Sequence, residues 1–355
     1  MTLRFAAPAV MGGADYRRAT ELTNAELHAP HLQPLLELPQ RGNHASLLGR
    51  TVAHLTELYA ELASYGWRLV QRPGADHSRA VSLLNSDVDA LADVRGERAD
   101  THHDDAPLPL NLEVLGPVSL AAQLHLPGGE KALIDHGARR DLADSLATGL
   151  MAHVAHVRRA AAAEQVHVVL LEPDYARVLA GDVPTASGYR TLRSLHRDET
   201  RQLLGVVVQA LRDAGAASVI LDFGQPMTAE QIEDFRSRSG SAVDGFTLPV
   251  HLAQTQDWER AAALVEDGAN LWAALLDPQE ADHSTRLPQV SALADRLAAP
   301  WRGLGMPLTA LEAFTVTGCG AEHRGRLARL SEAGSMRTLT RLRGAAEALT
   351  DQIRQ

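Results

Sequence analysis

Several acidic residues and the only cysteine of the chain follow short apolar runs. If these runs are parallel strands, such positions lie at the carboxyl ends of the strands, where barrels carry their reactive groups. In the clearest case, run 166–173, apolar residues lead to Glu172 and then to Pro173. Because proline cannot continue a sheet ladder, this run predicts a buried parallel strand that ends in a carboxylate. Glu172 could take part in chemistry at the strand end, or it could cap the following helix or pair with a nearby arginine.

The elements that must position such groups are eight apolar runs separated by helical patterns. This alternation predicts an α/β fold, a (β/α)8 barrel that occupies residues 1–355 as one domain. An open doubly wound sheet is less favoured, because no glycine fingerprint follows an early strand. The expected strands are 3–10, 35–39, 109–116, 166–173, 217–223, 242–250, 270–276 and 314–317. Helices are expected at 15–28, after Ser119, and at 135–163, 197–213, 228–238, 261–267 and 288–299.

The stretch 43–105 interrupts this rhythm and predicts a helical insertion after the second strand. Apolar residues from Leu47 to Leu62 recur at helical spacing, and a second helical pattern runs over 78–94. A charged segment, 95–105, follows as a solvated linker. Its cluster His102-His103-Asp104-Asp105 could bind metal, as could the pair His153 and His156 on a later helix, although such residues more often belong to a solvated surface.

Barrel closure would bring the strand ends together at one mouth. The groups expected there are Glu37, Glu172, Asp222, His251, Asp277 and Cys319. Cys319, between Gly318 and Gly320, could be a core filler, a reactive thiol or one ligand of a mixed metal site. The two glycines, with His323, Arg324 and Arg326 just beyond, could instead form a loop that grips a phosphate.

The composition excludes several classes of function. A net charge of -10 argues against a nucleic-acid partner, since phosphate-binding surfaces usually carry a basic excess. One cysteine excludes an internal disulfide and a cysteine-only zinc cage. No apolar stretch approaches the length of a membrane span and the N-terminus does not resemble a signal peptide, so a cytoplasmic location is expected.

Several runs together resemble a known family over nearly the whole chain. These runs are 31–42, 48–50, 66–69, 72–74, 114–121, 171–173, 183–188 and 317–320. They are similar to an actinobacterial group of methionine-synthase-like proteins. This group is related to the C-terminal barrel of cobalamin-independent methionine synthase and, more distantly, to uroporphyrinogen decarboxylase.

The resemblance implies a zinc-activated thiol, with zinc held by a His-x-Cys pair, a Glu on the next strand and a final Cys. Cys319 matches the final ligand, but Asp222 and Gly224 stand at the His-x-Cys positions, and Pro249 stands at the Glu position. The expected zinc site is therefore degenerate. Asp222, His251 and Cys319 form a substitute set with suitable donor types.

Two functions follow from the resemblance. The first is methyl transfer to a thiol such as homocysteine, with zinc as cofactor and with Glu172 and Glu37 orienting a small-molecule substrate. The second is a barrel that has lost this chemistry and binds a small molecule or a protein partner. A third possibility is a metal-free, anion-binding enzyme closer to the decarboxylase branch, which would use Arg324 or Arg326. The oligomeric state and the methyl donor stay open.

Overall fold

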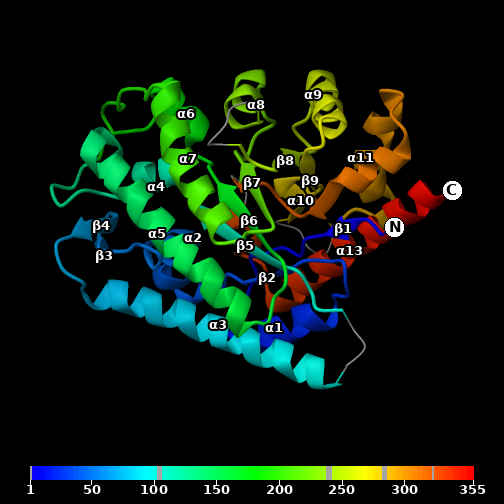
Figure 1. The fold of residues 1–355 in the computed structure, drawn as a ribbon, viewed down its shortest axis with the longest axis horizontal. Coiled ribbons are helices and arrows are strands. Elements are labelled where there is room, and N and C mark those ends of the chain that lie inside the picture. The colour runs from blue at the N-terminus through cyan, green and yellow to red at the C-terminus, as the bar shows by residue number, and fades with distance from the viewer. Residues whose placement is uncertain (1, 102–105, 237–241, 282–285, 322–323) are drawn as a thin grey trace.

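The computed structural model describes residues 2–101, 106–236, 242–281, 286–321 and 324–355. Eight parallel strands form a curled sheet at the centre of the molecule, and helices surround it (Figure 1). The strands are β1 (Arg4–Phe5), β2 (Gln33–Pro34), β5 (Leu110–Leu115), β6 (Val166–Leu171), β7 (Ser218–Asp222), β8 (Gly245–Pro249), β9 (Asn270–Ala274) and β10 (Phe314–Thr317).

Hydrogen bonds connect the strands in the order β1-β10-β9-β8-β7-β6-β5-β2. The ring closes next to β2, where the Leu32 N–H donates to the Phe5 carbonyl at 2.8 Å and the Ala7 N–H donates to the Leu32 carbonyl at 3.2 Å. The (β/α)8 barrel expected from the sequence is confirmed. β1 is shorter than expected because Pro8 lacks the N–H that a continuous ladder needs. The second strand was predicted at 35–39, whereas β2 lies just before this range and an isolated bridge pairs Glu37 with Val10.

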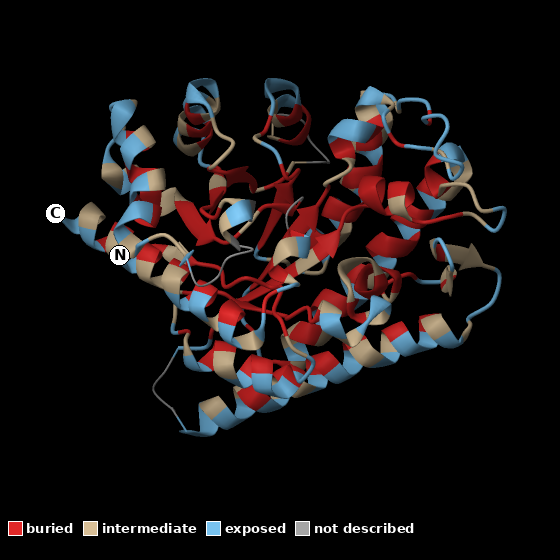
Figure 2. Cartoon of the chain, turned by 180° about the vertical axis from the view of Figure 1, so that it is seen from behind, coloured by how far each residue is buried: buried red, intermediate tan, exposed pale blue. Residues whose placement is uncertain are grey.

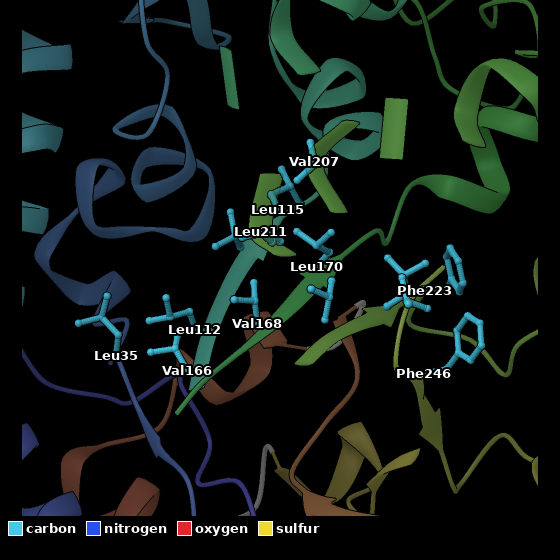
Figure 3. Packing of buried hydrophobic residues seen from close by; sticks show 14 of the residues in the cluster. Leu35, Leu112, Leu115, Val166, Val168, Leu170, Val207, Leu211, Phe223 and Phe246 are labelled. Carbon is cyan, nitrogen blue, oxygen red and sulfur yellow. The ribbon is translucent and has the colours of Figure 1, made fainter. Parts of the chain in front are cut away.

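The surrounding helices bury an apolar stripe against the sheet and expose a polar face, as the burial colours of Figure 2 show. On α7, Val207 and Leu211 are buried, and Figure 3 shows them near Leu170 on the outer face of β6. No helix in the described ranges combines the length and apolarity that a membrane span requires. The helices are α1 (Tyr16–Ala25), α2 (Leu47–Val52), α3 (Ala75–Thr101), α4 (Pro117–Gln123), α5 (His136–Ala160), α6 (Tyr175–Ala180), α7 (Arg197–Asp213), α8 (Ala229–Arg236), α9 (Thr255–Glu266), α10 (Pro278–Ala281), α11 (Val290–Gly303), α12 (Arg324–Leu327) and α13 (Glu332–Arg354).

The interior of the barrel is filled by side chains. A separate apolar cluster includes Val169, Leu171, Ile220 and Trp272. Along each strand, successive side chains point to opposite faces of the sheet. These residues therefore face the lumen, while the residues next to them in the sequence face the helices. The lumen is therefore a packed core, and any ligand must bind at one of its ends.

The stretch after β2 differs from its prediction. The helix expected over Leu47 to Leu62 ends at Val52, and a two-stranded antiparallel hairpin follows, with β3 (Tyr59–Ala63) and β4 (Gly66–Val70). Gly66 has a φ of 127°, which lets the chain reverse there at no steric cost. The spacing of leucines fitted a helix, but this turn decides the local structure.

The predicted solvated linker 95–105 is also wrong in its first part. Residues up to Thr101 continue α3, and the side chain of Arg95 bonds to the backbone of two other segments. The cluster His102 to Asp105 lies outside the described residues. On α5, His153 is buried against His54, with ring centroids 4.4 Å apart, so this histidine belongs to the core.

Candidate functional site

The mouth of the barrel, where the strands end, gathers charged side chains from distant parts of the chain. The guanidinium of Arg324 lies at its centre, 3.0 Å from Glu37 Oε2 through Nη1 and 2.6 Å from Glu113 Oε2 through Nη2. Arg324 is only 6% exposed. Burial opposes its charge, yet the carboxylates of Glu113 and Glu37 raise the pKa of Arg324 above its ordinary value. The three side chains thus form a buried ion cluster with one positive and two negative charges.

Glu37 has a second partner that fixes its position. Its Oε1 accepts a hydrogen bond from the Leu47 N–H at 2.9 Å, at the start of α2. The helix N-terminus favours a negative charge there. Glu37 therefore links the end of β2 to the inserted helix and to Arg324.

Glu172 is fully buried and bound to the N-terminus of α4. Its Oε1 accepts from the Val118 N–H at 3.0 Å, and its Oε2 accepts from the Ser119 N–H at 2.7 Å and from the Ser119 hydroxyl at 2.6 Å. Burial raises the pKa of Glu172 to about 7, although these three hydrogen bonds favour the charged form. Glu172 therefore caps a helix, but this helix is α4, which follows the neighbouring strand β5, and not the helix after Glu172 that was expected.

Asp222 is similarly buried and engaged by backbone. Its Oδ1 accepts from the Gly224 N–H at 2.8 Å and from the Ala321 N–H at 3.1 Å. Burial raises the pKa of Asp222 to about 6, and the nearby carboxylate of Glu113 contributes. Asp222 thereby attaches the loop after β10 to the end of β7.

Cys319, in that loop, is partly buried and packs against the apolar core. Burial, together with the carboxylates of Asp277 and Asp222, raises the pKa of the Cys319 thiol to about 12. The thiol is therefore protonated near neutral pH. His251 lies in the turn after β8 and is partly buried, at the same end of the barrel.

The donors of the substitute metal set do not fit a zinc ion in this arrangement. Across the described ranges, no three His, Cys, Asp or Glu side chains are grouped as metal ligands. The Oδ1 of Asp222 is already bound by two backbone N–H groups. Zinc would need at least three converging protein donors.

A cleft of about 490 Å³ lies above the ion cluster. Glu37 and Arg324 reach it from below, Leu47 and Leu48 form one wall, and Asp174 and Arg177 contribute a second ion pair with a contact of 2.9 Å. The volume falls within the range of about 300 to 1,000 Å³ that is usual for small-molecule sites. The cleft thus offers both signs of charge next to apolar surface.

Two roles in this site were not predicted from the sequence. Glu113 was not singled out, although strict alternation in 109–116 places it on one face of β5 together with Asn111. A loop that grips a phosphate was one alternative for Arg324, but its guanidinium contacts the two carboxylates. His323, which belonged to the same alternative, lies outside the described residues.

No protein-family model and no curated protein matches the chain. Among solved structures, a B12-independent methionine synthase from Shewanella sp. W3-18-1, in complex with selenomethionine, is similar over 99% of both chains. The TM-score is 0.59 and the sequence identity is 11%. The chain has a methionine-synthase-like barrel fold. At this identity the likeness confirms the expected fold and leaves activity, substrate and metal to be tested.

Proposed function

We propose that this methionine-synthase-like barrel binds a zwitterionic small molecule of amino-acid size in the mouth cleft, without the zinc chemistry that the resemblance implies. The supporting observation is the buried cluster of Arg324 between Glu37 and Glu113, directly below the cleft. Its carboxylates outnumber its cation, so the floor of the cleft attracts an ammonium group. Arg177 at the edge suits a carboxylate.

The size and surface of the cleft agree with such a ligand. Leu47 and Leu48 provide an apolar wall for a side chain like that of methionine. The structurally similar methionine synthase was solved in complex with selenomethionine, which is a ligand of this class. Preformed polar groups also reduce the ordering cost of binding, because Glu37 and Arg324 are already held in place.

Titration calorimetry tests this proposal with methionine, selenomethionine and homocysteine. N-acetylmethionine, which lacks the ammonium group, should bind at least tenfold more weakly. Leu48→Trp should fill the cleft and abolish binding, whereas Val206→Trp, at an exposed position on α7, should retain it. Equal affinities for methionine and N-acetylmethionine, or an unchanged affinity in Leu48→Trp, would refute the proposal.

A second candidate is methyl transfer to a thiol such as homocysteine, which the likeness of fold over 99% of both chains favours. Glu172 and Glu37 would then orient the substrate. The candidate also requires Cys319, Asp222 and His251 to converge on zinc, and the described residues do not bring these donors together as metal ligands. Zinc content of wild type and Cys319→Ser, together with an assay of methyl transfer from methylated folate to homocysteine, tests it. Stoichiometric zinc that disappears in the variant, with turnover, would favour this candidate.

A further inference from the structure

A second pocket, of about 280 Å³, lies at the opposite end of the barrel, where the strands begin. The end of α3, the end of α5 and the segment before β5 enclose it. Half of its lining residues are alanines, and a proline and Leu108 add further apolar surface. Two arginines from α3, Arg95 and Arg98, also line it, one helical turn apart.

Arg95 is held rigidly by uncharged oxygens. Its Nε donates to the Ala161 carbonyl at 2.7 Å, its Nη1 to Gln33 Oε1 at 2.9 Å and its Nη2 to the Leu108 carbonyl at 2.9 Å. A guanidinium has five N–H donors, so these bonds use three of them. The geometry orients the side chain without neutralising its charge.

The charge of Arg95 is only partly compensated. Burial, together with repulsion from Arg98, lowers the pKa of Arg95 to about 10, which leaves it charged near neutral pH. The C-terminus of α5, which includes the Ala161 carbonyl, supplies about half a negative charge through the helix dipole. The described lining residues contain no carboxylate, although acidic residues outnumber basic ones by 44 to 34 in the chain.

We propose that this pocket binds a small organic carboxylate with a compact apolar body. The guanidinium of Arg95 matches the planar geometry of a carboxylate, and the alanine-rich wall suits an apolar body. The volume limits the ligand to a size near that of benzoate, at the low end of small-molecule sites. The site is separate from the mouth cleft and does not depend on the function proposed for it.

Calorimetric titration of the full chain with benzoate tests the proposal. Saturable binding that weakens as salt concentration rises is expected, with benzamide, a neutral analogue, binding at least tenfold more weakly. Arg95→Met should weaken benzoate binding at least tenfold. Arg159→Met, which removes an equal charge at an exposed position on α5, should leave it unchanged.

A second variant covers the case in which Arg95→Met fails to fold. Gly96 lines the pocket, and a β-carbon there would meet no other atom within 4 Å. Because leucine favours a helix more than glycine does, Gly96→Leu should fold well and obstruct the pocket. Benzoate binding that is as strong in Gly96→Leu as in Arg159→Met would overturn the proposal, as would equal affinity for benzamide. The mouth variant Leu48→Trp should retain benzoate binding, so a failure at one site is distinguishable from a failure at the other.

Discussion

The carboxylate of Glu172 occupies the space where a β-carbon on residue 116 would lie, so only glycine fits at Gly116. The two residues end neighbouring strands, since Leu115 is the register partner of Leu171. This close approach lets Glu172 reach the N-terminus of α4 and accept bonds from Val118 and Ser119. Gly116 and Glu172 therefore act as one unit at the mouth of the barrel.

We expect Gly116→Ala to lower the free energy of unfolding by about 3 kcal/mol, near the upper end for an overpacked core. The new methyl group would displace Glu172 from its hydrogen bonds. Denaturant unfolding measures the change. Gly96→Ala is the matched control, because its methyl group meets open space within α3 and should raise stability by up to ~1 kcal/mol. Equal effects of the two substitutions would contradict the steric explanation.

Arg324→Met should destabilise the protein by about 3 to 5 kcal/mol, because Glu37 and Glu113 would remain buried without a counter-charge. Arg329→Met, at an exposed position in the same segment, should change the free energy of unfolding by less than about 0.5 kcal/mol. Adding Glu37→Gln to Arg324→Met should recover on the order of 1 kcal/mol. If the losses of unfolding free energy caused by the two substitutions were strictly additive, Arg324 and Glu37 would not be energetically coupled.

Buried histidines should make the protein less stable in acid. Burial, with a smaller contribution from Arg50, lowers the pKa of His54 to about 3, well below the value of about 6.5 in an unfolded chain. The unfolded chain then binds more protons as the pH falls below about 6.5, so stability decreases down to the folded pKa. At pH 5 this cost is about 2 kcal/mol for His54.

The free energy of unfolding, measured between pH 7.5 and pH 5, should therefore fall about 2 kcal/mol less in His54→Gln than in wild type. A profile of His54→Gln that parallels the wild-type profile would contradict the assigned protonation state.

Glu172, in contrast to the buried histidines, should make the folded protein more stable at low pH than at high pH. Its folded pKa of about 7 lies above the ordinary value of 4.5, so the folded state binds its proton more tightly. This contribution, about 3 kcal/mol, is fully present below about pH 4.5 and is lost as the pH rises through about 7. Carboxyl carbon NMR of glutamate-labelled protein should show one resonance with a midpoint near 7 that is absent in Glu172→Gln. A midpoint at or below 4.5 would mean that the hydrogen bonds outweigh burial.

The sequence pattern sufficed for the barrel because eight short apolar runs separated by helical patterns leave few other arrangements. It also located Glu172 and Asp222 at strand ends, since a strand end is a local property. The partners of these side chains were not predictable in the same way. Glu172 caps a helix that starts 55 residues earlier, and this contact depends on the register between β5 and β6.

The role of Arg324 shows the same limit. Arg324 and Glu37 are 287 positions apart, and only closure of the ring brings them together. The hairpin of β3 and β4 was missed for a different reason. Leucines at 55, 58 and 62 satisfy helical spacing, whereas the turn that ends at Gly66 carries only a short signal.

The position of β1 has a consequence for how the nascent chain folds. Arg4 is synthesised well before Thr315, its register partner on β10. Until that segment is synthesised, β1 and β9 each lack the neighbour that β10 provides. The ring therefore cannot close before β10 is available, and a chain truncated before Phe314 would expose two sheet edges prone to aggregation.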